Sequence, residues 1–151
     1  MENTDMKKEN GLQEERRVVT DGQELAETAP QLRASGVTDV TVVVNTLNYT
    51  RYQKSNDGKS LQPVIDGINK AVGEGLRVRL EVALEEGFND DEVLDFLQLT
   101  LQHKYDIVFL PTMDYGKIKE KMPMLRKVDG DFGDVEFYKY AIARGRIGFK
   151  K

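Results

Sequence analysis

Cysteine is absent from the 151-residue sequence, and histidine occurs once. Without cysteine the chain can form no disulfide bond and no thiolate zinc site, and it has none of the thiolates that ordinarily bind iron–sulfur clusters. A single histidine leaves little for a transition metal, because such ions are commonly held by imidazole and thiolate ligands. The metal ions that the composition still allows are magnesium and calcium, which bind through oxygen atoms.

The sequence also lacks a long apolar run and an excess of positive charge. No apolar stretch approaches the roughly 20 residues that a membrane helix needs, and the N-terminus has no signal-peptide core. The net charge of −4 argues against a general binder of nucleic acid or acidic membranes, because both need a concentrated positive surface. We therefore expect a cytoplasmic protein with no nucleic acid and no membrane as partner.

The length and composition suit one compact domain, since 39% of the 151 residues are hydrophobic. Residues 1–16 are rich in charge and hold only isolated apolar side chains, so they cannot bury enough surface to offset the entropy lost on ordering. We predict a disordered tail at residues 1–16, an α/β unit at 17–128 and a C-terminal hairpin extension at 129–151.

Strand and helix patterns alternate along the chain and predict an α/β fold. Parallel strands joined by helical crossovers favour a partial TIM-like barrel of about four βα units, or a small open sheet, followed by a C-terminal β-hairpin. The predicted strands cover residues 17–20, 40–44, 78–85 and 106–110, with hairpin strands at 135–142 and 146–149. The predicted helices cover 25–36, 61–72, 89–101 and 117–127, and Pro123 is expected to interrupt the last of them.

Several of these elements carry specific expectations. The apolar run 40–44 is typical of a central parallel strand that is covered on both faces. Pro30 is expected to weaken the first helix or to confine its regular part to the residues that follow. Asn89 is expected to cap the third helix, with Asp90, Asp91 and Glu92 at its positive end and a buried stripe of Val93, Leu94, Phe96, Leu97 and Leu101.

The polar residues have simple structural interpretations when taken alone. Arg79 and Glu81 share one face of a strand, where an ordinary polar pair on an exposed sheet face is favoured over an anchor for an anionic ligand. His103 falls near a helix end without a recognisable catalytic partner, so we interpret it as structural. The lysines of residues 117–127 fit a solvated helix face.

Four segments resemble a known family. Thr20-Asp21-Gly22 matches a strand that ends in Thr-Asn-Gly, and residues 42–48 match a strand end that reads Val-Ser-Leu-Asp-Ser-Leu-Asp. Residues 87–92 match a helix start that reads Gly-Val-Asn-Asp-Asp-Glu, and residues 145–149 match a segment that precedes cluster-binding cysteines. In these segments the chain resembles the radical S-adenosylmethionine enzymes, and most of all the GTP cyclases that begin molybdenum-cofactor biosynthesis.

That family uses S-adenosylmethionine and 4Fe–4S clusters, and the match lacks both cluster motifs. The resemblance places the CxxxCxxC loop and a Gly-Gly-Glu motif upstream of where this chain begins, and the cysteines of a second cluster beyond where it ends. Within the match, Val43 and Asn45 stand where the family has a cofactor-contacting serine and an aspartate, and residues 108–111 lack two of its charges. Thr20 keeps a hydroxyl, and Arg79 keeps the charge of a family lysine.

The resemblance therefore implies a truncated or degenerate radical S-adenosylmethionine protein that is not catalytic by itself. We expect no cofactor, catalytic residue or metal ligand in this chain, but a weak cofactor-binding set of Thr20, Asn45 and Arg79 for an adenosyl or guanine nucleotide. Two alternatives stay open. One is an assembly module that pairs with itself or with a separate N-terminal half through open sheet edges, and the other is a folded remnant of a broken gene without a selected role.

Overall fold

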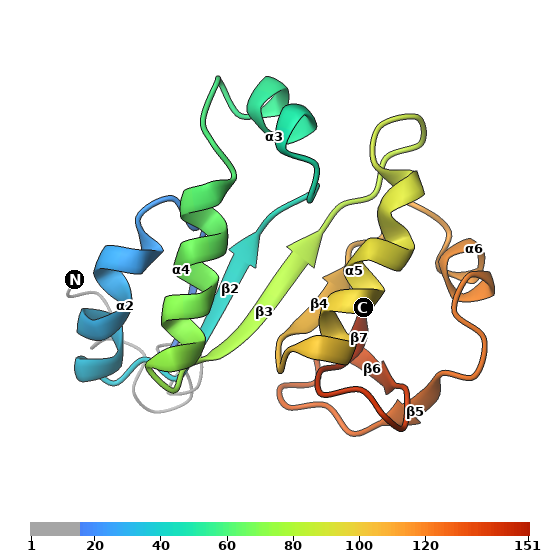
Figure 1. The fold of residues 1–151 in the computed structure, drawn as a ribbon. Coiled ribbons are helices and arrows are strands. Elements are labelled where there is room, and N and C mark those ends of the chain that lie inside the picture. Colours follow the sequence, from blue (N-terminus) through green and yellow to red (C-terminus); the bar gives the residue numbers. More distant parts are fainter. Residues whose placement is uncertain (1–15) are drawn as a thin grey trace. The chain divides into compact units, whose positions relative to one another are not determined.

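Strands alternate with helices along the chain in the computed structural model, which describes residues 16–151 (Figure 1). Contacts within the chain group these residues into two units. The first unit holds residues 16–43 and 61–78, and the second unit holds residues 44–60 and 79–151. All of the predicted tail except Arg16 lies outside the described residues.

The first unit combines two parallel strands with two helices. β1 (Arg17–Thr20) pairs with β2 (Asp39–Val43), and Val18 lies opposite Val40. α2 (Leu25–Ala34) and α4 (Gln62–Gly73) lie side by side (Figure 1). Apolar side chains that are at most 3% exposed form the core of this unit: Leu25, Ala29, Val40, Val42, Val64, Ile68 and Ala71.

The second unit carries the remaining strands. β3 (Arg77–Val82) starts in the first unit and continues into the second, where it pairs in parallel with β4 (Asp106–Phe109). β4 pairs in parallel with β7 (Ile147–Lys150), while β6 (Val135–Lys139) lies antiparallel between β7 and β5 (Arg126–Val128). The helical segments of this unit are α3 (Tyr49–Ser55), the 3₁₀ turn η2 (Asp90–Glu92), α5 (Val93–Gln102) and α6 (Tyr115–Glu120).

Side-chain alternation gives the strands of the second unit an apolar face and a charged face. On the apolar face, the ring of Phe109 meets Phe96 of α5 edge-on at 6.4 Å, and Phe149 meets Tyr115 of α6 at 4.8 Å. The opposite face, which we call the charged sheet face, combines a buried cluster of Val108, Val135 and Phe137 with the side chains of Arg79, Glu81, Asp106, Arg146 and Lys150.

The α/β class, the parallel pairing and the C-terminal hairpin are confirmed, whereas closure as a partial barrel stays a prediction. Pro30 does not confine the first helix to the residues that follow it, because α2 begins at Leu25 and continues through the proline; a weakening of the helix by Pro30 stays a prediction. The proline removes one helical hydrogen bond, but Leu25 and Ala29 are buried, and this burial favours the helix on both sides of the proline.

Other elements also differ from the predictions. α3 and β5 were not expected, and α6 ends at Glu120 rather than near Lys127. Leu94 is 55% exposed and so does not belong to the buried stripe of α5, and Val43 is 37% exposed at the end of a strand expected to be covered. Within residues 16–151, none of the helices has both the length and the apolar character needed to cross a lipid bilayer.

Replacing Gly67 with alanine is expected to destabilise the protein by about 1–3 kcal/mol, the usual cost of overpacking. A Cβ atom at Gly67 would lie 2.7 Å from Cβ of Leu25 and 3.0 Å from the carbonyl oxygen of Gly22, so α2 and α4 would have to separate. Gly73→Ala is the matched control, because no atom lies within 4 Å of a Cβ there and alanine favours the helix. Urea unfolding followed by circular dichroism measures both variants, and equal stabilities would contradict this account of the packing.

Candidate functional site

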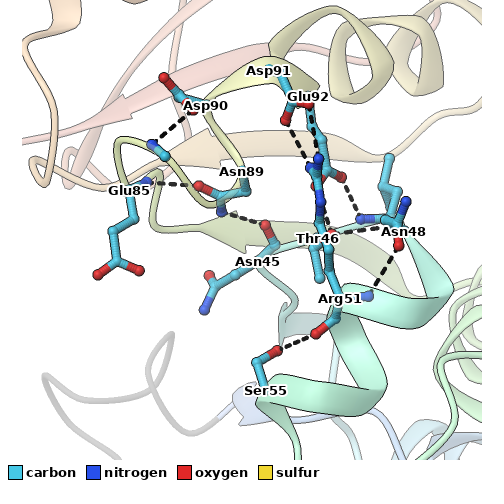
Figure 2. Close-up of polar contacts among 12 residues, drawn as sticks. Asn45, Thr46, Asn48, Arg51, Ser55, Glu85, Asn89, Asp90, Asp91 and Glu92 are labelled. Atoms are coloured by element: carbon cyan, nitrogen blue, oxygen red, sulfur yellow. Dashed lines mark hydrogen bonds and ion pairs between the residues drawn. The ribbon is translucent and has the colours of Figure 1, made fainter.

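The loop after β3 is held by the side chain of Asn89, which is fully buried. Its Oδ1 accepts the N–H of Glu85 at 2.6 Å, and its Nδ2 donates to the carbonyl oxygens of Asn45 at 2.5 Å and Ala83 at 3.0 Å (Figure 2). A buried amide left without such partners costs about 1–3 kcal/mol. Asn89 therefore fixes the backbone of Asn45 against the end of β3.

The carboxylate of Glu92 is a second buried polar group, and this residue is 4% exposed. It accepts the hydroxyl of Thr46 at 2.6 Å, the N–H of Leu47 at 2.7 Å and Nη1 of Arg51 at 2.8 Å. Arg51 also donates to both carboxylate oxygens of Asp91, at 2.7 and 2.9 Å (Figure 2). These bonds attach the start of α5 to α3 and to the residues just before it.

The prediction that Asn89 caps the third helix was wrong. Neither Asn89 nor Glu92 makes a side-chain capping bond, because the Asn89 amide binds the loop before it and Asn45, and the Glu92 carboxylate binds residues 46–51. The acidic residues act through Arg51 instead. Hydrogen bonding to Asp91 is the largest cause that raises the pKa of Arg51, and the bond from Arg51 lowers the pKa of Asp91, so both groups stay charged near neutral pH.

A pocket of about 1080 Å³ opens beside this loop within the second unit. It lies where β3 and β4 end, and α/β proteins generally bind ligands at the carboxyl ends of their parallel strands. Phe88 and Met113 give it apolar surface, and Asn45 gives it a side-chain amide. The charged side chains that line it are Glu85, Glu86, Asp90, Asp114, Lys117, Glu120 and Lys121.

The lining of the pocket limits the chemistry of a ligand. Carboxylates outnumber ammonium groups around it, so a polyphosphate would meet net repulsion, whereas a neutral or cationic polar group would not. Oδ1 of Asn45 accepts the N–H of Ala83 at 2.9 Å, which orients the side-chain amide and leaves Nδ2 as a donor on the pocket wall.

Arg79 lies away from this pocket, on the charged sheet face. The residue is 8% exposed, so the expectation of a polar pair on an exposed face was wrong about its burial. Nη1 of Arg79 lies 3.0 Å from Oδ2 of Asp134, and the guanidinium stands 5.5 Å from the centre of the Phe137 ring. Asn45 binds Ala83, about 13 Å further along β3. Asn45 and Arg79 therefore sit toward opposite ends of this strand.

Arg146 occupies the same face and is paired even more fully. Its Nη2 lies 2.6 Å from Oδ2 of Asp106 and 2.5 Å from Oδ2 of Asp131, and its guanidinium stands 3.9 Å above the Phe137 ring. Burial alone would lower the pKa of Arg146, but the hydrogen bonds to Asp106 and Asp131 outweigh it, so the pKa is raised. The cations of the charged sheet face are thus matched by carboxylates of the chain itself.

Thr20, the third predicted cofactor-binding residue, ends β1 in the first unit. Its hydroxyl accepts the N–H of Gly22 at 3.0 Å, and Gly22 has a φ of 84°, which glycine adopts easily. The matched motif at residues 20–22 therefore forms the turn into α2. Nucleotide binding by Thr20, Asn45 and Arg79 stays a prediction.

Sequence reasoning missed Asp134, because a glycine-rich turn gives no signal of the partner that its carboxylate will meet.

The resemblance implies S-adenosylmethionine and 4Fe–4S clusters as cofactors. The residues of this chain do not fit a cluster, because the sequence has no cysteine to supply thiolates. No three His, Asp or Glu side chains gather as a metal site in the part of the chain that the structure describes. Nη1 of Arg79 donates to Asp134, and Oδ1 of Asn45 accepts the N–H of Ala83, so a ligand at either atom would compete with a group of the chain.

Comparison with known proteins shows what the chain is related to. No family model matches it. A GTP 3′,8-cyclase of Peptoclostridium acidaminophilum is 31% identical over 149 residues, which cover 87% of this chain and 46% of the relative. A GTP 3′,8-cyclase of Alkaliphilus oremlandii is 34% identical over 104 residues, covering 68% of this chain and 32% of the relative. A GTP 3′,8-cyclase 2 of Pseudomonas aeruginosa is 34% identical over 102 residues, covering 67% of this chain and 31% of the relative.

This similarity makes the chain a homologue of the GTP 3′,8-cyclases. The chain spans less than half the length of these curated relatives. The resemblance drawn from the sequence is thereby confirmed. Its most complete motif, residues 87–92, binds the chain to itself through Asn89, Asp91 and Glu92 (Figure 2).

Replacing Glu92 with glutamine is expected to destabilise the protein by about 2–3 kcal/mol, because the amide presents an N–H₂ group to donors that the buried carboxylate now satisfies. Asp91→Asn is the control: it also removes one negative charge beside Arg51, but the Asp91 side chain is 64% exposed, and we expect a much smaller loss. Thermal unfolding of the two variants measures the difference. A larger loss for Asp91→Asn would show that the buried carboxylate is not the main support of this loop.

Proposed function

We propose that this chain is a relative of the GTP 3′,8-cyclases, connected with molybdenum-cofactor biosynthesis, that does not perform radical chemistry by itself. The absence of cysteine from all 151 residues carries the proposal, because a radical-generating 4Fe–4S cluster needs thiolate ligands. The activity in the relatives' name belongs to proteins more than twice as long as the region they share with this chain.

The charged sheet face supports the same proposal. Arg79 and Arg146 are the buried or half-buried cations that an anionic reactant would meet there, and both are bound by carboxylates of the chain. A reactant would have to displace these ion pairs, which costs more than filling a hydrated site. The pocket at the carboxyl ends of β3 and β4 offers a site without such competition, and it suits a neutral or cationic polar ligand.

Anaerobic reconstitution with iron and sulfide tests the lack of independent catalysis. We expect the purified chain to bind no cluster, seen as no broad iron–sulfur absorbance, and to cleave no S-adenosylmethionine in the presence of reductant and GTP. The GTP 3′,8-cyclase of Peptoclostridium acidaminophilum, treated in parallel, serves as the positive control. Stoichiometric cluster binding, or S-adenosylmethionine cleavage above the protein-free blank, would overturn the proposal.

Assembly with itself or with a separate N-terminal half is a second candidate function. The β1–β2 pair of the first unit favours it, because β1 pairs only with β2 among the described residues. Val19 is 70% exposed on β1, and Val43 is 37% exposed on the same face of this strand pair. An edge strand with exposed apolar side chains invites pairing with another chain.

Replacing Val19 with lysine is expected to abolish self-association, because a charge on the edge strand opposes strand pairing. Sedimentation equilibrium over a wide concentration range compares the variant with the unaltered chain. Ile142→Lys, which changes an 84% exposed side chain between β6 and β7, is the control and should associate normally. The assembly function has a second test, in which the chain is mixed with a cluster-bearing N-terminal half of a relative. The proposal is wrong if the unaltered chain is a monomer at every concentration and this half neither binds it nor restores S-adenosylmethionine cleavage.

A further inference from the structure

The carboxylate of Asp134 occupies the place on the charged sheet face where a bound anion would sit. Its Oδ2 lies 3.0 Å from Nη1 of Arg79 and 4.0 Å from Nζ of Lys150. Lys150 also contacts Glu81, at 3.2 Å. Asp134 is the carboxylate that pairs with Arg79, and the Arg79 side chain is only 10% exposed. A buried guanidinium requires such a counter-ion.

The guanidinium groups of the charged sheet face are oriented by the aromatic ring of Phe137. The guanidinium groups of Arg79 and Arg146 stand 5.5 and 3.9 Å from the centre of the Phe137 ring, and Phe137 is 1% exposed. Stacking on a buried ring restricts the orientation of a guanidinium without using its N–H groups. Arginine held in this way binds the paired oxygens of a carboxylate or a phosphate well.

Asp134 comes from a turn rather than from a strand. The turn 129–134 precedes β6, and Gly133 within it has a φ of 80°. Asp134 is not among the residues paired between β6 and β7, whose register begins with Val135 opposite Lys150. Asp131 of the same turn differs, because its partner Arg146 would still keep Asp106.

We propose that Arg79, Lys150 and the Phe137 ring form an oxyanion-binding site that the chain fills with its own Asp134, so that a phosphate or carboxylate ligand binds in competition with the turn 129–134. This self-occupation does not depend on the proposed lack of catalysis, since it rests on ion pairs alone. The site is separate from the acidic pocket at the carboxyl ends of β3 and β4, whose lining residues do not include Arg79, Asp134 or Lys150.

Removing the internal anion should make the protein responsive to an external one. We expect Asp134→Asn to lower the melting temperature by about 5 °C, because Arg79 loses its counter-ion. Sodium phosphate at constant ionic strength should restore at least half of that loss, and sodium chloride should not. Sodium acetate, in a parallel series, tells whether a carboxylate serves as well as a phosphate. The unaltered chain should gain less from phosphate than Asp134→Asn does, because phosphate must first displace the Asp134 carboxylate.

Asp131→Asn is the matched control, since it removes the same charge from the same turn while Arg146 keeps Asp106. Phosphate should stabilise it no more than it stabilises the unaltered chain. In the double variant Arg79→Met with Asp134→Asn the rescue should disappear. Equal phosphate responses of Asp134→Asn and Asp131→Asn, or rescue that survives the loss of Arg79, would overturn the proposal.

Hydrogen exchange of the unaltered chain gives a test that does not need the variant to fold. The N–H of Lys151 donates to the carbonyl oxygen of Asp134 at 3.0 Å, so release of the turn should expose it. We expect phosphate to speed exchange at residues 129–135 and at Lys151 relative to chloride at equal ionic strength. Unchanged exchange at saturating phosphate would show that no external oxyanion competes with Asp134.

Discussion

A charge that is taken out of water needs an opposite charge or hydrogen bonds close by, and the second unit depends on meeting that need. Glu92 and Arg79 are the two clearest cases, at 4% and 8% exposure. Glu92 is satisfied by groups from residues 46–51, and Arg79 is satisfied by Asp134. In both cases the partners are distant in sequence, so these polar contacts decide which loop meets which strand end. The apolar faces, by contrast, specify only which side of a strand is covered.

The same requirement separates the two regions that could serve a ligand. On the charged sheet face the chain supplies its own counter-ions, and any ligand must compete with them. At the carboxyl ends of β3 and β4, the lining charges are mostly exposed and the pocket is open to solvent. Ligand binding there needs no ion pair to break, although the excess of carboxylates disfavours a polyphosphate.

The sequence predicted most of the fold because periodicity reports burial directly. The apolar residues Val78, Leu80 and Val82, which alternate along one predicted strand, are all buried. The helical spacing in residues 61–72 matched the buried face of α4 except at Val72, which is 36% exposed. The prediction from sequence failed at Pro30, where the local effect of a proline had to be weighed against packing. It also missed α3, which is short; the Asn48 side chain caps this helix by accepting the N–H of Arg51 at 3.0 Å. The partners of Arg79 and Asn89 were beyond its reach, because they depend on which distant loops meet.

The segment 87–92 shows that a sequence motif shared with relatives can have a structural role in this chain. Its residues match the family motif almost completely, yet their side chains bind other parts of this chain. Asn89 bonds to Asn45, Asp91 to Arg51, and Glu92 to Thr46. A motif with such a role supports the scaffold whether or not a cofactor binds, so its presence identifies ancestry and says little about chemistry. Its functional consequence is indirect: by fixing the backbone of Asn45, it sets where the one side-chain amide of the pocket points.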